Sequence, residues 1–339
     1  MFFMMSKKWL FFIFLIFSLV SFSQTYDSYK PERDKIHDLV HTKLKVDFNF
    51  NKKELNGEAW VTAKPHFYAT DHFSLDAKAM IIHQVSFNNE ILEYSYDDYK
   101  INIDLPKEFR KGEEFTIYIK YTARPEKVAQ KGSAAITSAK GLYFINADGY
   151  DKNKPTQIWT QGETEASSCW FPTIDTPNQK TTQEIYITVP KRFVTLSNGK
   201  LVDQVVNGSN RTDYWKMDKK HAPYLFFMGV GEYEIIKDSY NNIPIDYYVE
   251  KKYAPYAKDI FGNTPEMMEF FSRILGVAFP WNKYSQIVGR DYVSGAMENT
   301  TAVIHGEQAY QTPGQLIDEN IQENTIAHEL FHHWFGNLV

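Results

Sequence analysis

The chain has little cysteine and no strong excess of charge of either sign. Cys169 is the single cysteine among 339 residues, so no disulfide can form within the chain and stability has to come from packing. A buried structural thiol is therefore favoured for Cys169 over a catalytic nucleophile. The formal net charge of −5 is mild, and we expect no nucleic-acid partner, because such surfaces are strongly basic.

Glycine and proline are not in excess either. Their counts of 17 and 14 exclude a collagen-like or low-complexity chain. Hydrophobic residues at 43% and charged residues at 23% are typical of a folded globular protein. The unusual feature is an aromatic content of 16%, which favours strands and large cores. At roughly 150 residues per domain, the length suggests two domains.

Long apolar runs are absent except near the N-terminus. Two lysines precede a twelve-residue apolar run at Trp9–Val20, and Ser21 and Ser23 are small residues suited to a cleavage site. This pattern predicts a signal peptide over residues 1–23. The run is shorter than the ~18–20 residues that span a bilayer, so an anchor is disfavoured. We expect an exported protein, periplasmic or extracellular, with no stable membrane span after cleavage.

From about Val40 to Ile236 apolar and polar residues alternate, as in strands with one buried face. The pair Asn198-Gly199 is a strong signal for a hairpin turn. These features predict a large antiparallel β domain over residues 24–237. The alternating runs place these residues on one face each: Leu44, Val46, Phe48 and Phe50; Phe115, Ile117, Ile119 and Tyr121; Ile185, Ile187 and Val189.

After about Lys237 the pattern becomes helical, which predicts a second domain over residues 238–339. Thr264 precedes Pro-Glu and is expected to cap a helix that Gly276 ends. A second helix is expected from near Asp318 to the end of the chain, because apolar pairs recur there at helical spacing. The fold class predicted from these patterns is multidomain α+β.

A metal-binding motif lies on the second predicted helix. His328-Glu329-Leu330-Phe331-His332 matches H-E-x-x-H, and residues four apart share one helix face, so both imidazoles can reach one Zn²⁺ ion. Glu329 is placed to take a proton from a zinc-bound water, whose pKa the metal lowers to ~7. His333 projects about 100° away and is not expected to be a ligand. His305, in a strand-like run, is expected to be structural.

Two histidines do not complete a catalytic zinc site, which normally has three protein ligands and an open position. The extended motif H-E-x-x-H-x-x-G-x-x-H is excluded, because Phe335 and Leu338 occupy the positions that need glycine and histidine. The third ligand is therefore expected beyond Val339. As it stands, we expect the chain to be inactive or nearly so.

Three further motifs accompany H-E-x-x-H. These are Gly295-Ala296-Met297-Glu298-Asn299, the stretch Thr160-Gln161-Gly162-Glu163, and the run Trp334–Val339 after the zinc motif. Together they resemble the aminopeptidase N and leukotriene hydrolase family of gluzincin aminopeptidases. The resemblance implies an N-terminal β-sandwich or saddle, followed by the beginning of a thermolysin-like zinc peptidase domain.

The resemblance also implies roles for individual residues. Glu329 matches the general base, and His328 and His332 match two zinc ligands of the one Zn²⁺ per catalytic domain. The family's third ligand is a glutamate roughly nineteen residues beyond the second histidine, and its oxyanion-stabilising tyrosine lies farther on. The residues implied to bind the substrate, with the two acids holding its free amine, are Gln161, Glu163, Gly295, Ala296, Met297, Glu298 and Asn299.

The sequence thus predicts a zinc aminopeptidase that acts on peptides with a free N-terminus. Two alternatives stay open. A zinc endopeptidase shares the H-E-x-x-H chemistry but needs no anchor for an amine. A non-catalytic relative would bind peptides without cleaving them, although the intact motif argues against it.

Overall fold

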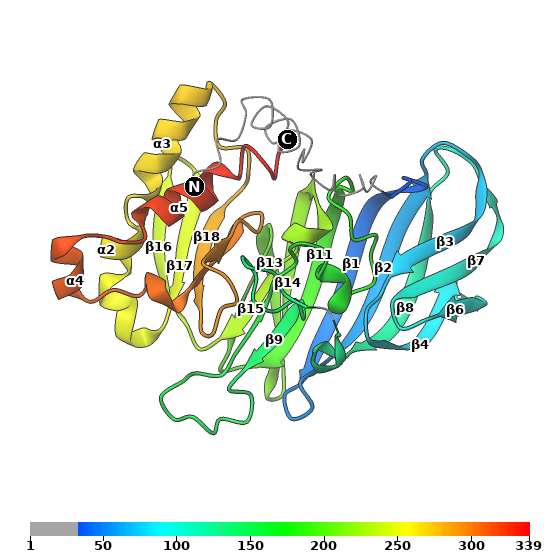
Figure 1. The fold of residues 1–339 in the computed structure, drawn as a ribbon, viewed down its shortest axis with the longest axis horizontal. Helices are drawn as coiled ribbons and strands as arrows, with labels where there is room; N and C mark the ends of the chain where they lie inside the picture. The colour runs from blue at the N-terminus through cyan, green and yellow to red at the C-terminus, as the bar shows by residue number, and fades with distance from the viewer. Residues whose placement is uncertain (1–32, 130) are drawn as a thin grey trace, which may run out of the picture. The chain divides into compact units, whose positions relative to one another are not determined.

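The computed structural model describes residues 33–129 and 131–339, of which Ile36–Val339 form one compact unit. The predicted signal peptide lies outside the described residues. Within the described part, the strands form four sheets and the longer helices gather near the C-terminal end of the chain (Figure 1). No helix there is both long enough and apolar enough to cross a bilayer.

The largest sheet has eight strands in the order β13-β14-β11-β1-β2-β8-β4-β5. Its pairs are antiparallel except β1 with β11, which run parallel, so the antiparallel prediction is wrong at this one pair. Its strands are β1 (His37–Asn49), β2 (Glu54–Pro65), β4 (Met80–Phe87), β5 (Glu90–Ile91), β8 (Phe115–Ala123), β11 (Thr181–Pro190), β13 (Lys200–Asn207) and β14 (Asn210–His221).

A three-stranded sheet, in the order β3-β7-β6, packs on this large sheet. Phe73 of the small sheet meets Phe115 of the large sheet edge to face, with ring centroids 5.1 Å apart. Both belong to one buried core, which confirms the predicted β-sandwich. The three strands are β3 (Thr70–Asp76), β6 (Tyr94–Tyr96) and β7 (Lys100–Phe109).

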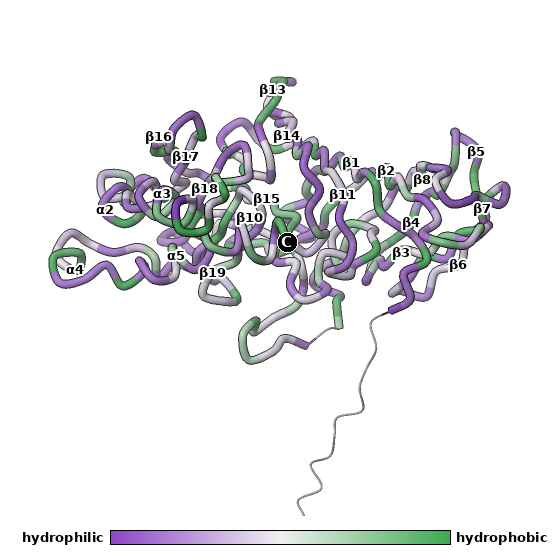
Figure 2. The backbone as a smooth tube through the Cα atoms, turned by 90° about the horizontal axis from the view of Figure 1, so that it is seen from above, coloured by the Kyte–Doolittle hydropathy of each residue, from purple (hydrophilic) through white to green (hydrophobic). Residues whose placement is uncertain are grey.

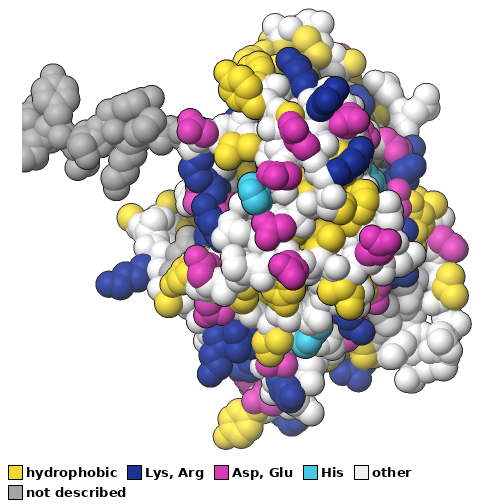
Figure 3. All heavy atoms as spheres, turned by 90° about the vertical axis from the view of Figure 1, so that its right-hand side faces the viewer, with side chains coloured by type: hydrophobic (Ala, Val, Ile, Leu, Met, Phe, Trp, Pro, Cys, Tyr) yellow, Lys and Arg dark blue, Asp and Glu magenta, His cyan; other side chains and the backbone are white. Residues whose placement is uncertain are grey.

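On the face drawn in Figure 3, acidic and basic side chains are interspersed.

The alternation in the sequence corresponds to burial in the large sheet. Leu44, Ile117 and Ile185 are fully buried, and their neighbours Lys43, Thr116 and Glu184 are partly exposed, as the period-two pattern predicts.

Two further sheets lead toward the C-terminal part. The first, in the order β12-β15-β10-β9, comprises β9 (Leu142–Ile145), β10 (Gln157–Thr160), β12 (Val194–Ser197) and β15 (Met228–Gly231). The second, in the order β16-β17-β18-β20-β19, comprises β16 (Glu234–Tyr240), β17 (Ile243–Val249), β18 (Tyr284–Gly289), β19 (Ala296–Met297) and β20 (Ala302–Gly306). Residue 237, where the sequence places the domain boundary, lies in β16, and the boundary stays a prediction.

Asn198-Gly199 does not make the predicted hairpin. It joins β12 to β13, which belong to different sheets. Gly199 has the left-handed φ of +74° that the sequence signal implies, but the pair turns the chain between sheets instead of reversing it within one. The Asn198 side chain is buried and bonded to the backbone of two other segments, which explains why tertiary contacts override the local preference.

The helical part consists of α2 (Ala257–Phe261), α3 (Thr264–Leu275), α4 (Pro313–Asp318) and α5 (Glu323–Phe331). Figures 1 and 2 both place α3 and α5 beside β18. Met268 of α3 and Leu330 of α5 are buried in one core with Tyr284 and Val303 of the sheet. This packing fixes α5 on the sheet. Short 3₁₀ helices lie at Pro125–Lys127, Ser167–Cys169, Pro223–Leu225, Lys251–Tyr256 and Glu307–Ala309.

The predicted start of α3 is one residue off. Asn263 is the capping residue, and Thr264 begins the helix while its hydroxyl donates to the carbonyl of Phe261. Gly276 ends the helix at φ +66°, as predicted.

The second predicted helix is wrong at both ends. A separate helix, α4, begins at Pro313 after Thr312, which forms a capping box with Gln315, and α5 begins only at Glu323. α5 ends at Phe331. Beyond it some backbone hydrogen bonds span three residues instead of four, such as the bond from Trp334 N–H to the Phe331 carbonyl, and Gly336 adopts a positive φ of +123°. The expectation that residue 339 lies within a helix is therefore also wrong.

Candidate active site

The final turn of α5 and the residue that follows it carry the H-E-x-x-H side chains. His328 Nε2 and His332 Nε2 lie 3.1 Å apart, so the helix does bring both imidazoles together. His332 Nδ1 lies 3.1 Å from the carbonyl oxygen of Phe335, which orients the ring and leaves Nε2 toward His328. The pair thus presents two nitrogen atoms that could bind the same metal ion.

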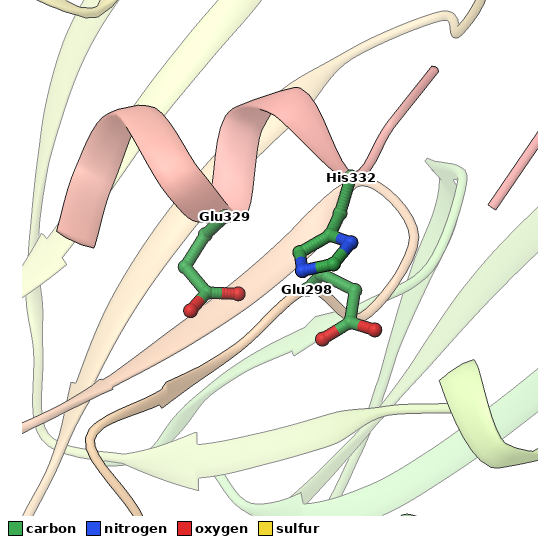
Figure 4. A group of neighbouring side chains, drawn as sticks. All are labelled: Glu298, Glu329 and His332. Carbon is green, nitrogen blue, oxygen red and sulfur yellow. The ribbon is translucent and has the colours of Figure 1, made fainter. Parts of the chain in front are cut away.

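Glu298 meets α5 from a different element. It directly follows β19, whose pairing with β20 brings the end of the strand beneath the helix. One ligand-type atom each of Glu298, Glu329 and His332 lies within 4.8 Å of the others, and Figure 4 shows Glu329 and His332 on the same side of α5, with Glu298 close to His332. Residues about thirty positions apart in the chain thus share one site.

Burial and neighbouring charges raise the pKa of two carboxylates of this site. Glu329 is 6% exposed, and its burial, followed by the charges of Glu298 and Glu163, raises its pKa to about 8. Burial and then the charge of Glu298 also raise the pKa of Glu163, while His332 opposes this shift. These charge effects indicate that Glu163 lies near Glu298 and Glu329, and its role in binding the substrate stays a prediction.

The donor set fits a divalent cation. Glu329 Oε2 is buried and has no hydrogen-bond partner among the described residues, although a buried carboxylate oxygen normally needs one. Two imidazoles among several carboxylates are a nitrogen and oxygen set that Zn²⁺ accepts. A cation would also relieve the repulsion among Glu163, Glu298 and Glu329.

Gln161 lies on the other side of the site, just after β10. It is 1% exposed, its Oε1 accepts from the Tyr292 hydroxyl at 2.5 Å, and its Nε2 donates to Met297 Sδ at 3.4 Å. Gln161 and Met297, which are 136 positions apart, are thereby in contact. Sequence reasoning missed Tyr292, because no motif spacing marks it.

The remaining residues predicted to bind the substrate differ in their exposure to solvent. Gly295 is exposed, and a Cβ atom there would meet nothing within 4 Å. Ala296 lies in β19, which in the described part of the chain is the edge strand of its sheet. Asn299 is fully buried, and neither polar atom of its amide has a hydrogen-bond partner among the described residues.

Tyr224 is a second residue that sequence reasoning missed. It is partly buried, and burial, followed by the charges of Glu298 and Glu163, raises the pKa of its hydroxyl to about 12. Its hydroxyl therefore stays protonated near both carboxylates and is available as a hydrogen-bond donor. Only the fold brings Tyr224 to this site.

His333, which is not expected to be a ligand, and His305, which is expected to be structural, are both buried. His333 is fully buried, its Nε2 accepts from Thr301 N–H at 2.9 Å, and its Nδ1 donates to the Glu329 carbonyl at 3.1 Å. Both ring nitrogens are therefore occupied by the backbone. His305 is buried on β20, where Nε2 lies 2.9 Å from Gln286 Oε1. Cys169 is also buried, as predicted.

Comparison with known families matches two segments of the chain. The peptidase M1 N-terminal domain matches residues 26–225, and the peptidase family M1 domain matches residues 260–339.

Curated relatives include Aminopeptidase M1 of Arabidopsis thaliana, 29% identical over 59% of this chain and 23% of the relative. Another is the puromycin-sensitive aminopeptidase of Caenorhabditis elegans, 26% identical over 88% of this chain and 32% of the relative. The chain thus spans no more than about a third of the length of these relatives.

Solved structures share the fold. An M1 zinc metallopeptidase from Deinococcus radiodurans has a TM-score of 0.70 at 16% identity, covering 90% of this chain and 65% of that one. A mutant two-domain M1 zinc metallopeptidase bound to L-tryptophan has a TM-score of 0.71 at 16% identity, with 92% and 67% covered. At this identity the likeness concerns the fold alone.

Proposed function

The chain belongs to peptidase family M1, with that family's N-terminal domain and the beginning of its zinc metallopeptidase domain, and from this premise we propose that the complete protein is a zinc aminopeptidase. It would release N-terminal residues from peptides that have a free amine. The observation that carries the proposal is that Glu163 and Glu298, from separate elements, lie near Glu329 and the histidine pair of α5.

Glu163 and Glu298 supply the preference for a free N-terminus. Burial and then the charge of Glu298 raise the pKa of Glu163, and a cation placed between the two carboxylates would be stabilised by both charges. An α-ammonium fits this need and can donate charge-assisted hydrogen bonds to each carboxylate. An endopeptidase would have no use for such a pair, which favours the aminopeptidase over that alternative.

His328 and His332 would hold the zinc ion. When bound, Zn²⁺ would act as a Lewis acid that lowers the pKa of a water molecule to about 7.

Glu329 would serve as the general base and acid. Burial and the charges of Glu298 and Glu163 raise its pKa, so the ionised carboxylate is a stronger base than an ordinary one, and the charge of a bound cation would keep it ionised. It accepts a proton from the water molecule whose oxygen attacks the scissile carbonyl carbon, and it returns the proton to the nitrogen as the C–N bond breaks.

The substrate backbone would lie along β19. Strand edges offer unpaired backbone groups, and the exposed Gly295 leaves room for a close approach. The first side chain would then face Gln161, whose amide is oriented by Tyr292 and Met297.

Export is part of the proposal. The pattern over residues 1–23 supports a cleaved signal peptide, with the mature protein periplasmic or extracellular. N-terminal sequencing of the protein recovered outside the cytoplasm should begin at Gln24. Recovery of the uncleaved chain from the cytoplasm would contradict it.

The function is tested with matched substrates. The complete zinc-loaded protein should cleave an alanyl-leucyl peptide with a free amine and leave its N-acetylated counterpart intact. Equal cleavage of both would favour a zinc endopeptidase. Binding of the free peptide without any cleavage would favour a non-catalytic relative.

A further inference from the structure

The segment Glu298–Thr301, which joins β19 to β20, is bonded to the chain after α5 at two points. Asn337 Nδ2 donates to the Glu298 carbonyl oxygen at 2.9 Å, and Asn337 N–H donates to the His332 carbonyl at 3.0 Å. One residue therefore joins the main chains of His332 and Glu298, through its backbone N–H and its side-chain amide. Asn337 is fully buried, so neither bond competes with solvent.

His333 makes a second bridge in the same direction. Its Nδ1 donates to the Glu329 carbonyl at 3.1 Å, and its Nε2 accepts from Thr301 N–H at 2.9 Å. The two bonds require the neutral ring with its proton on Nδ1. His333 therefore links the backbone of Glu329 to Thr301, three residues after Glu298.

The opposite side of the segment is held by two residues of the β domain and by Lys283. Asn198 Nδ2 donates to the Thr300 carbonyl at 2.7 Å, and Gly199 N–H donates to Thr301 Oγ1 at 2.8 Å. Lys283 Nζ donates to the carbonyl oxygens of Ser197 and Thr301 at 2.9 and 2.8 Å. With its far side anchored in this way, the segment is joined to the chain at and after α5 by the hydrogen bonds of Asn337 and His333.

We propose that Asn337 and His333 are positioning residues that set the separation between the Glu298 carboxylate and the His332 and Glu329 side chains. Each bridge ends on the backbone of a residue of the H-E-x-x-H motif at one side and on the Glu298–Thr301 segment at the other. The proposed roles of Glu298 and Glu329 require one carboxylate at the amine of the first substrate residue and the other at the scissile bond, at the carbonyl end of the same residue. This inference rests on the proposed function and adds the residues that hold its two carboxylates at the required separation.

The positioning role differs from general core packing in what it changes. Loss of packing lowers stability and affects every ligand alike. Loss of a bridge shifts Glu298, so it weakens ligands that have an α-amine and spares those that lack one. The informative quantity is the ratio of two inhibition constants, for leucine amide and for its des-amino analogue 4-methylpentanamide.

Asn337→Asp tests the first bridge in the complete zinc-loaded protein. The substitution keeps the size of the side chain and replaces the donor with an oxygen that faces the Glu298 carbonyl. We expect the inhibition constant of leucine amide to rise about tenfold or more, because a broken buried bond is costly, while that of 4-methylpentanamide changes less than about twofold. Zinc content and the melting temperature report whether the variant is folded and loaded.

Asn320→Asp is the matched control. Asn320 Nδ2 also donates to a backbone carbonyl, that of Ile260, at 2.8 Å, and it is partly buried, but it contacts no site residue. Both inhibition constants should stay unchanged in this variant. An equal loss of discrimination in the Asn320 and Asn337 variants would overturn the positioning role.

His333 provides an independent test should the Asn337 variant not fold. His333→Leu leaves Thr301 N–H without an acceptor and should reduce discrimination between the two amides, whereas His333→Gln supplies an amide oxygen as acceptor and should restore it. Equal discrimination in both His333 variants and the wild type would overturn the inference. A wild-type protein that binds both amides equally would instead overturn the proposed function, and the positioning role with it.

Discussion

Glu329 and Glu163 are both glutamates of the candidate site, but their surroundings differ. Glu329 projects from α5 into the core, where it is 6% exposed, and burial raises its pKa to about 8. Glu163 lies in the loop after β10 and is only partly buried, and its pKa is raised to a smaller extent. The helix thus places a basic carboxylate suited to proton transfer, and the loop places a charge suited to recognising an ammonium group.

The largest effect expected from this comparison follows removal of the base. Glu329→Gln in the complete protein should lower kcat by roughly 10²–10⁴-fold, the usual contribution of general acid–base catalysis. Initial-rate assays with an alanyl anilide substrate measure this change in kcat. Glu323→Gln, on the exposed first turn of the same helix, is the control and should retain activity. A Glu329 variant with normal kcat would remove the distinction between the two glutamates.

A smaller effect, of a different kind, is expected at the loop. Glu163→Gln should raise the KM for free-amine substrates roughly tenfold to a hundredfold, because a hydrogen bond to a charged group contributes about 1.5–3 kcal/mol. The value of kcat should fall less than in the Glu329 variant. Glu165→Gln, an exposed neighbour, is the matched control. If Glu163→Gln lowered kcat alone, the assigned division of roles would be wrong.

Burial also governs titration away from the site, at His221 of β14. His221 is fully buried, and burial lowers its pKa to about 3. Between pH ~6.5, the ordinary pKa of histidine, and the lowered pKa of about 3, His221 binds a proton in the unfolded chain but not in the folded chain. Acidification should therefore lower the free energy of unfolding by up to ~1.4 kcal/mol per pH unit for this group, with no contribution above pH ~6.5.

Urea unfolding at pH 7 and pH 5 measures this slope. His221→Phe removes the titrating group and should make the pH dependence shallower, whatever it does to stability at pH 7. An unchanged slope would show that burial of His221 does not persist in solution.

The smallest effect is expected at Cys169, which follows Glu163 closely in sequence but faces the core. Its thiol is buried, and burial raises its pKa to about 12. Cys169→Ala should change kcat/KM by less than about twofold, because a buried protonated thiol is inert. Iodoacetamide should label Cys169 only after unfolding. Rapid labelling of the folded protein, or loss of activity in the variant, would contradict this.

Much of the fold could be predicted because its signals are local. The alternation around Leu44 and Ile117 gives the strands, and Gly276 ends α3 where its conformational freedom predicts. Local signals fail where distant contacts decide the outcome. Asn198-Gly199 has the composition of a hairpin, but bonds from Asn198 to Leu225 and Thr300 direct the turn between sheets. Apolar spacing also runs past Phe331, although α5 ends there.

By itself, the sequence determined that His328, Glu329 and His332 lie near one another, because their spacing puts them within about one helical turn, whatever surrounds the helix. Only the tertiary structure decided how these residues meet the others. The contact of Gln161 with Tyr292, and the bond from Asn337 to Glu298, join segments 131 and 39 positions apart. Such contacts depend on how sheets and helices pack, and the periodicity that defines each strand or helix contains no information about its distant neighbours.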